Sequence, residues 1–495
     1  MNKIDRIVVL GGGSAGLIAA ATLKRKLPSL DIEVLRSPEI GIIGVGEGTT
    51  AAFPRHFFEY LRLSPESFFQ IAEPTWKLGI KFEWGPQDFF YTFARECEQR
   101  WPELRRNLAF YQQPGIPWLG ITSACMAKGK AFPRKPDGTP HIHRLHAYHI
   151  ENVKLVKWLE TLCAQENVKI TDGKMTHAEV ENGEVNALVL ETGGRMTADL
   201  FIDASGFRSE LLGKALQTPY VSYADALFCD RAVIAGWPRT DEPILAYTRA
   251  ETMDAGWCWQ IEHMDWINRG YVYSSRFISD EAALAEFRRK NPKIANEPRV
   301  VKFRSGRYEA LWSGNVVGIG NSAGFVEPLE ATALQVICVE CSTLADVLMD
   351  SLQEPTPSII SLYNHYNTLA WDDIRDFLAI HYAFNTRLDT PFWRACREEV
   401  ALGGAARIVE YYRENGPSVL AGSMLVHPSN SFGMDGFVTL LAGQQVPHAK
   451  PCQPTPEETL VVQQRLAGYA MHAERGLGVK ESLEILRAQG QIQFG

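Results

Sequence analysis

The segment Arg6–Leu27, RIVVLGGGSAGLIAAATLKRKL, places a short apolar run, a glycine loop and a helical pattern in immediate succession. Arg6–Leu10 has the composition of a buried parallel strand, and the residues from Ser14 onward have helical periodicity. A second apolar run, DIEVLR at Asp31–Arg36, predicts the next strand. The sequence therefore predicts a βαβ unit close to the first residue.

The glycine loop has the pattern Gly-x-Gly-x-x-Gly at Gly11, Gly13 and Gly16. The first glycine allows a tight turn, the second lets the backbone approach a pyrophosphate, and the third permits close packing of helix on strand. The helix that begins at Ser14 and Ala15 would donate N–H groups to the phosphates. This context predicts an adenine dinucleotide cofactor, and the alternative is a glycine turn without a ligand.

Arg36 stands about where an acidic residue usually binds the ribose of NAD or FAD, some 20 residues after such a loop. An arginine there could instead favour a 2′-phosphate and hence NADP. Glu33 and Glu39 are nearby but out of register. We keep Arg36 as a cofactor-site candidate and leave its partner group open.

Two later loops favour FAD over NAD(P). Asp203–Leu212 (DASGFRSELL) and Gly314–Leu334 (GNVVGIGNSAGFVEPLEATAL) follow apolar strands and are rich in small residues. We expect the second loop to open a helix near Gly324–Pro328, where the helix N-terminus would stabilise negative charge on a reduced isoalloxazine. A flavin in extended form needs such distant loops. Their candidate cofactor contacts are Asp203, Gly320, Asn321 and Gly324.

The composition bounds the class of protein. The chain has 495 residues, 45% of them apolar, a net charge of −8 and nine scattered cysteines. A large core in two or three units is expected. The acidic balance argues against nucleic acid or an anionic membrane surface as partner. No run approaches the ~18 apolar residues of a membrane span, and no signal peptide is recognisable, so we expect a soluble cytoplasmic protein.

The pattern along the chain predicts a discontinuous FAD-binding domain over residues 1–340. An inserted substrate region, about residues 55–150, is rich in aromatic residues, proline and histidine. Helix and strand alternate again over residues 151–235, and short strands continue to about residue 320. A helical C-terminal region, residues 341–495, is expected to cover the substrate pocket.

The segment Trp76–Gly85, WKLGIKFEWG, contains two lysines in a strand-like alternation. Ile80, Phe82 and Trp84 would lie along one face. Lys77 is either a solvated residue at a strand edge or a buried amine with chemistry to perform. The segment alone leaves both open.

Seven segments together resemble the flavin-dependent halogenases of the tryptophan halogenase family. They are GGGSAGLIAA, IIGVGEGTT (residues 42–50), WKLGIKFEWG, LFIDASGFRS, GWCWQIEH (residues 256–263), GNSAGFVEPLEATAL and HYAFNTRLDTPFW (residues 381–393). The resemblance implies an α/β fold, Rossmann-type and FAD-binding as in flavin monooxygenases and halogenases, with a β-sheet substrate region and a mainly helical C-terminal part. It also implies cofactor contacts at Gly46, Glu47, Gly48 and Thr49.

The same resemblance implies a chemistry. Reduced FAD, oxygen and a chloride or bromide ion would yield hypohalous acid, which a lysine matching Lys77 presents to an indole, phenol or pyrrole ring. The partner carboxylate matches Glu330, and backbone N–H groups at Thr332 and Ala333 would bind the halide. No second nucleotide domain is apparent, so a separate flavin reductase would supply reduced FAD. The resemblance is also compatible with a homodimer.

The sequence departs from the family pattern in two places. The fingerprint Trp-x-Trp-x-Ile-Pro keeps Trp257, Trp259 and Ile261 but has Glu262 instead of proline, followed by His263. We expect this change to loosen a rigid φ angle and to add an ionisable pair to the wall beside the flavin. Ala333 replaces a glycine and is tolerable only if its φ is negative. These departures keep a second hypothesis open, a flavin monooxygenase that hydroxylates an aromatic ring, including one held in a peptide or on a carrier.

Two other groups of residues give weaker indications of function. The four histidines of HIHRLHAYH (residues 141–149) lack cysteines or clustered carboxylates, so no metal is predicted. Cys338 and Cys341 lie within an apolar helical pattern, typical of packed thiols. A third hypothesis is an FAD-binding protein without turnover.

Overall fold

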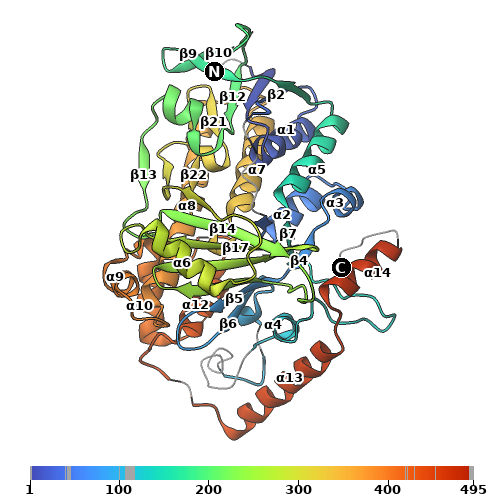
Figure 1. Ribbon diagram of the computed structural model, residues 1–495, viewed down its shortest axis with the longest axis vertical. Helices are drawn as coiled ribbons and strands as arrows, with labels where there is room; N and C mark the ends of the chain where they lie inside the picture. Colours follow the sequence, from blue (N-terminus) through green and yellow to red (C-terminus); the bar gives the residue numbers. More distant parts are fainter. Residues whose placement is uncertain are drawn as a thin grey trace. The chain divides into compact units, whose positions relative to one another are not determined.

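The computed structural model describes residues 3–39, 41, 46–99, 101–105, 118–418, 420, 422–427, 430–451 and 453–489. The chain divides into two compact units, each made of three separate segments. Unit 1 comprises residues 1–73, 150–223 and 303–372, and unit 2 comprises residues 74–149, 224–302 and 373–495. Figure 1 labels many of their elements.

Unit 1 is built on a six-stranded sheet of order β20-β21-β12-β1-β2-β8. All neighbouring strands run parallel except β20 and β21. The strands are β1 (Arg6–Leu10), β2 (Asp31–Arg36), β8 (Lys169–Asp172), β12 (Leu200–Asp203), β20 (Trp312–Ser313) and β21 (Val316–Gly318). The predicted strand–loop–helix–strand unit at the start of the chain is confirmed.

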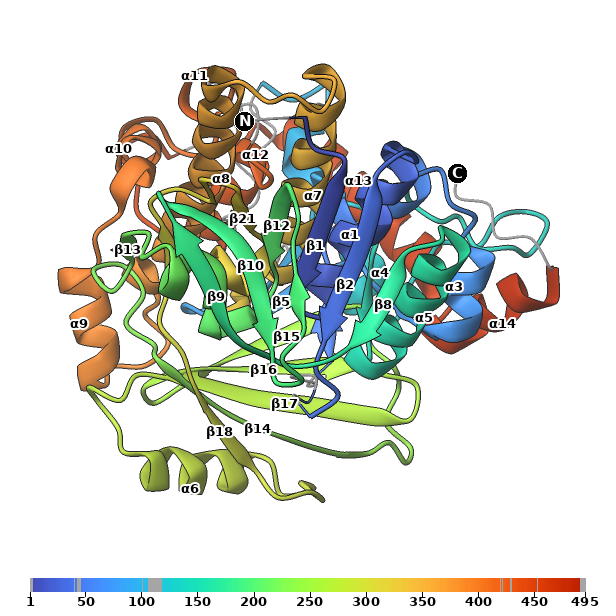
Figure 2. The same cartoon turned by 90° about the horizontal axis from the view of Figure 1, so that it is seen from above.

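Two layers cover this sheet. On one face the helix α1 (Ser14–Lys26) packs against α5 (Asn152–Gln165) and α7 (Ala333–Asp350). On the other face lies an antiparallel sheet of β9 (Met175–Glu181), β10 (Glu184–Leu190) and β11 (Arg195–Met196), as Figure 2 shows. The core between the two sheets includes Val8, Leu35, Leu188 and Phe201. The expected Rossmann-type α/β fold is confirmed.

The shorter elements of unit 1 include one correction to the sequence-based expectations. They are β3 (Glu47–Gly48), α2 (Ala52–Pro54), a π-helix (Arg55–Tyr60), α3 (Glu66–Ile71), β13 (Tyr220–Ser222), β19 (Gly306–Tyr308) and β22 (Gly324–Phe325). The helix expected near Gly324–Pro328 begins only at Ala333. Ala331 has a φ of 56°, a left-handed conformation that a helix cannot contain, so the chain makes a separate 3₁₀ turn first.

Unit 2 is built on a seven-stranded sheet of order β18-β14-β17-β16-β15-β5-β6. Only the β15–β5 pair is parallel. The strands are β5 (Gly79–Glu83), β6 (Phe89–Thr92), β14 (Arg231–Pro238), β15 (Thr248–Met253), β16 (Gly256–Glu262), β17 (Trp266–Tyr273) and β18 (Arg299–Lys302). The helix α6 (Asp280–Lys290) packs on one face through Ala283 and Phe287.

A second strand pair in unit 2 joins β4 (Thr75–Lys77) to β7 (Ala147–Ile150) in antiparallel fashion. The remaining helices confirm the expected helical character of the C-terminal part. They are α4 (Ile121–Ala127), α8 (Pro357–Phe384), α9 (Pro391–Glu399), α10 (Ala406–Asn415), α11 (Gly422–Leu425), α12 (Gly433–Gly443), α13 (Pro456–Glu474) and α14 (Val479–Gln489). The expected border at residue 340 falls within α7, and that division of the chain stays a prediction.

Candidate active site

Three loops of unit 1 meet at one edge of the parallel sheet. They follow the neighbouring strands β1, β12 and β21, whose carboxyl ends share an edge, the usual ligand position in such sheets. The N–H of Ile319 donates to the carbonyl of Asp203 at 2.9 Å. A Cβ on Gly11 would lie 2.3 Å from the carbonyl oxygen of Ala204, so these two loops are in contact. The structure thus brings together the loops that the sequence singled out.

The glycine loop fits a dinucleotide. A Cβ built on Gly13 meets nothing within 4 Å, whereas one on Gly16 would lie 1.9 Å from the carbonyl oxygen of Gly11. Gly16 therefore holds helix to strand, and Gly13 leaves open space at the N-terminus of α1. Ser14, the first residue of α1, donates its hydroxyl to Asn152 Oδ1 at 2.8 Å, and Ala15 follows it in the first turn.

Asp203 is fully buried and orders its own loop. Its Oδ1 accepts from the N–H and hydroxyl of Ser205, and its Oδ2 accepts from the N–H groups of Leu211 and Leu212 at 2.8 and 2.9 Å. These bonds shape the loop beside the glycine turn. A direct contact between Asp203 and a cofactor stays a prediction.

Arg36 ends β2 between two acidic side chains. Its Nε donates to Asp172 Oδ1 at 2.6 Å, and its guanidinium also pairs with Glu160. These bonds, with the nearby negative charges, raise the pKa of Arg36. Because the guanidinium already has two anionic partners, it would stabilise the 2′-phosphate of NADP less than the sequence alone suggested. The side chain still lies at the loop, since a Cβ on Gly12 would touch it.

The loop Gly320–Gly324 is held by a buried carboxylate that the sequence analysis missed. Glu340 of α7 accepts from the N–H of Gly320 at 2.7 Å and from Trp371 Nε1 at 2.9 Å. Burial raises the pKa of Glu340 to about 8. A glutamate inside the apolar run LQVICVECSTLADVL was the available signal. Asn321 and Gly324 belong to the same loop, with Gly324 in β22.

The segment Gly46–Thr49 also lies in unit 1, while residues 42–45 of the motif IIGVGEGTT lie outside the described residues. Gly46 has a φ of 74°, and Glu47 and Gly48 form β3. Burial raises the pKa of Glu47 to about 7. Thr49 is fully buried. The cofactor contacts of these four residues stay predictions.

Glu330 lies at the end of the 3₁₀ turn before α7 and is buried. Thr332 is the N-cap of α7 and Ala333 is its first residue. Ala333 is not among the described residues with positive φ, so alanine is tolerated in place of glycine. The first N–H groups of an 18-residue helix have no partner within it, and such a terminus attracts anions.

Lys77 is a buried amine and not a solvated strand-edge residue. It is 0% exposed, at the end of β4 in unit 2, and its Nζ lies 5.3 Å from the centroid of the Phe93 ring. In the β4–β7 pair Thr75 lies opposite His149 and Lys77 opposite Ala147, so all four share one face. Burial, and next the charge on Lys77, lower the pKa of His149 well below its ordinary value.

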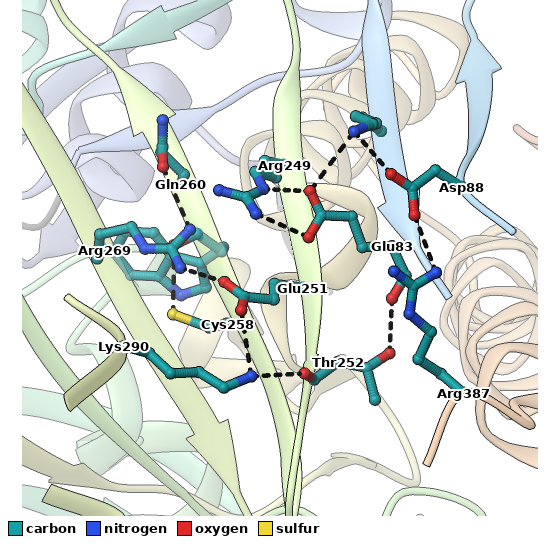
Figure 3. A network of polar contacts seen from close by, with 12 residues as sticks. Glu83, Asp88, Arg249, Glu251, Thr252, Cys258, Gln260, Arg269, Lys290 and Arg387 are labelled. Atoms are coloured by element: carbon teal, nitrogen blue, oxygen red, sulfur yellow. Dashed lines mark hydrogen bonds and ion pairs between the residues drawn. The ribbon is translucent and has the colours of Figure 1, made fainter. Parts of the chain in front are cut away.

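The second lysine of the segment, Lys81, lies on the opposite side of β5 from Ile80 and Phe82. It pairs at 2.8 Å with Asp88, which Figure 3 labels in a network of polar contacts. The two lysines of WKLGIKFEWG therefore differ sharply: one is ion-paired beside solvent, and the other is enclosed.

The side chains of the family fingerprint lie on two opposite faces of the strand β16. Trp257, Trp259 and Ile261 are buried and alternate with Cys258, Gln260 and Glu262. Gln260 Nε2 donates to Glu262 Oε1 at 2.6 Å, so these two side chains share the face opposite the tryptophans. Of the ionisable pair expected in the wall formed by the tryptophans, Glu262 thus lies on the opposite face, because a strand alternates its side chains, and a role for His263 there stays a prediction.

Within the described ranges, no three His, Cys, Asp or Glu side chains are grouped so as to bind a metal ion. Among the helices of the described residues, none is long and apolar enough to span a membrane.

Glycine-rich loops at the carboxyl edge of a parallel sheet define a dinucleotide-binding protein of the flavoprotein class. The tryptophan halogenase family model matches residues 6–456. Tryptophan 7-halogenase KtzQ of Kutzneria sp. (strain 744) is 33% identical over 445 residues, covering 84% of this chain and 83% of its own length. Tryptophan 7-halogenase RebH of Lentzea aerocolonigenes is 30% identical over 440 residues, covering 83% and 82%.

Solved structures agree. The chain superposes on MibH, described as a lathipeptide tryptophan 5-halogenase, with a TM-score of 0.89 and 35% identity over 98% of this chain and 94% of that one. For the tryptophan 6-halogenase SttH of Streptomyces toxytricini the values are 0.85 and 27%, over 98% and 100%. This chain belongs to the tryptophan halogenase family, flavin-dependent enzymes that halogenate aromatic substrates.

Proposed function

We propose that this enzyme halogenates the indole ring of tryptophan, with Lys77 presenting hypohalous acid to the ring. The observation that carries the proposal is the complete burial of Lys77 at the position that matches the family lysine. KtzQ, RebH and MibH are described as tryptophan halogenases, which supports tryptophan as the residue whose ring is halogenated. MibH, at 35% identity, further supports a tryptophan held in a peptide as one form of the substrate.

Bound FAD in its reduced form supplies, with oxygen, the oxidising equivalent that converts a halide into hypohalous acid. The residues present fit FAD, because Gly13 leaves open space at the N-terminus of α1. The N–H groups of Thr332 and Ala333 at the start of α7 would hold the halide. The described residues contain one glycine-loop sheet of this kind, which supports a separate flavin reductase as the source of reduced FAD.

At the lysine the reaction is an electrophilic substitution, HOX + ArH → ArX + H2O. Lys77 would hold the hypohalous acid by a hydrogen bond and deliver the halogen to a ring carbon, while Glu330 would accept the proton that the ring carbon loses. A buried amine suits this task because few water molecules compete for its hydrogen bonds.

Mass spectrometry of products tests the proposal. Purified enzyme receives FAD, a flavin reductase, NADH and sodium bromide, with tryptophan, a tryptophan-containing peptide and a phenol as substrates. Lys77→Ala should abolish the bromine isotope doublet, whereas Lys81→Ala, four residues away, should retain it. Oxygen addition that survives both catalase and Lys77→Ala would instead establish the hydroxylase. FAD bound without any product would favour a protein that has lost turnover.

A further inference from the structure

A buried ion pair stands at the place where the family fingerprint has proline. Glu262 Oε2 accepts from the Arg239 guanidinium at 2.6 Å, and the two side chains are only 1% and 7% exposed. Such a pair is costly to bury and to break, since removing one partner leaves the other charge without compensation. The proposed chemistry gives the pair no role, so its presence needs a reason.

Arg239 binds more than the carboxylate. Its Nε and terminal nitrogens donate to the carbonyl oxygens of His263 and Met264, which follow β16, and to those of Glu242 and Pro243 in the preceding loop. Five N–H donors in a rigid fork suit this arrangement. The guanidinium therefore fixes the backbone at the end of β16, and Glu262 fixes the guanidinium.

The backbone at that point holds the strand of Lys77. The carbonyl oxygen of Glu262 accepts the hydroxyl of Thr75, which is 1% exposed. Thr75 lies two residues before Lys77 in β4 and on the same face. Contacts thus lead from Arg239 through Glu262 to Thr75, which belongs to the same short strand as Lys77.

We propose that Glu262 and Arg239 are positioning residues for Lys77, holding β4 through the Glu262 carbonyl and Thr75. Proline would stiffen this end of β16 through its fixed φ, and here an ion pair with a multiply bonded guanidinium gives the stiffness instead. The inference rests on the proposed function of Lys77. It names no role for Glu262 beside the flavin, since Glu262 faces away from Trp257 and Trp259.

The same sheet offers a matched control. Glu251 of β15 pairs with Arg269 at 2.6 Å and with Lys290 at 3.1 Å, as Figure 3 shows, and Arg269 is 2% exposed. Glu251→Gln therefore breaks a partly buried ion pair on the same face of the same sheet. Its carboxylate accepts hydrogen bonds from Arg269 and Lys290, and neither residue belongs to β4.

The experiment compares Glu262→Gln, Glu251→Gln, Thr75→Val and Thr75→Ser in the full-length enzyme loaded with FAD. Glu262→Gln and Thr75→Val should each lower kcat for bromination about tenfold, with KM for the aromatic substrate little changed. They should also raise the share of oxidant that escapes, measured as bromination of phenol red added to the solution. Thr75→Ser keeps the hydroxyl and should retain wild-type values, and Glu251→Gln should leave both readouts unchanged.

A double variant closes the test. Glu262→Gln with Thr75→Val should lose little more than either single variant, because the two act through one chain of contacts. Equal losses in Glu262→Gln and Glu251→Gln, tracking their melting temperatures, would overturn the proposal. Lys77→Ala is run in parallel: if it still brominates, the proposed function itself fails, and that outcome is visible before the Glu262 variants are compared.

Discussion

At the scale of single residues, Gly13 and Gly16 separate cofactor binding from folding. The two glycines belong to one motif, yet a side chain at Gly13 meets open space while one at Gly16 strikes the backbone of Gly11. The φ of Gly13 is −82°, which alanine adopts without strain. The motif therefore contains one position reserved for a ligand and one for the protein itself.

Gly13→Ala should weaken FAD binding at least tenfold and leave the melting temperature of the protein without FAD unchanged. Gly16→Ala should lower that melting temperature, because its Cβ would overlap the Gly11 carbonyl. Flavin fluorescence titration and thermal unfolding measure the two effects. Normal FAD affinity in Gly13→Ala would place the pyrophosphate elsewhere.

His56 gives unit 1 a defined sensitivity to acid. Its Nε2 lies 2.9 Å from Thr22 Oγ1, and burial, followed by the charge on Lys26, lowers the pKa of His56 to about 3. The unfolded chain takes up a proton near pH 6.5 while the folded chain resists it. Stability present above pH 6.5 is therefore lost as the pH falls toward 3.

Between pH 6.5 and pH 5 this linkage should cost about 2 kcal/mol of unfolding free energy. His56→Gln, which keeps a partner for Thr22, should lose correspondingly less over that interval. Urea unfolding of both proteins at pH 5, 6.5 and 7.5 measures the difference. Parallel curves for the two proteins would mean that His56 is protonated in the folded state.

At the scale of elements, the helix α7 contributes to the candidate site at two points along its length. Its first turn presents the N–H groups proposed for the halide, and Glu340, two turns further on, holds the N–H of Gly320. The helix thereby links the loop at the sheet edge to the proposed halide site.

Glu340→Ala should lower FAD affinity about tenfold, because the Gly320 N–H loses its acceptor and the loop loses its anchor. Glu340→Gln keeps one acceptor oxygen and should bind FAD within about threefold of wild type. Isothermal titration with FAD at pH 7 distinguishes the two variants. An unaffected Glu340→Ala protein would show that the loop is held by its other contacts, such as Ser209 with the Ser322 carbonyl.

Elements were predictable from sequence where one physical signal dominated. Apolar runs and glycine spacing predicted β1, the loop and α1, because strand burial and turn geometry leave a clear pattern. The start of α7 was not predictable, because no residue type in EPLEAT indicates that Ala331 adopts a positive φ. Arg239 lies 23 residues from Glu262, so no local pattern could pair them.

At the scale of the whole molecule, both units are discontinuous. Unit 1 takes its third segment from residues 303–372, which contain all of α7. The candidate residues are spread accordingly: Glu330 and the glycine loops belong to unit 1, and Lys77 and the Trp257 segment to unit 2. The sequence indicated that the domains are discontinuous, but it could not predict which distant segments fold together into one unit. A homodimer and a cytoplasmic location stay predictions.

A fragment of residues 1–340 tests the division of the chain that the sequence suggested. Cutting α7 at its middle shortens a helix that packs against α1, so we expect the fragment to be largely unfolded and unable to bind FAD. Circular dichroism and flavin fluorescence give the answer, with the full chain as reference. A folded fragment that binds FAD would support a domain border near residue 340.

The strand β16 carries a lesson for tracing ancestry. Its tryptophan face and its Glu262 face contact different neighbours, so selection can hold one constant while the other drifts. A motif written as an unbroken string of letters penalises such drift and would set this chain apart from its relatives. A pattern that scores only every second position, Trp257, Trp259 and Ile261, would group this chain with its relatives. The positions between them could then be compared separately.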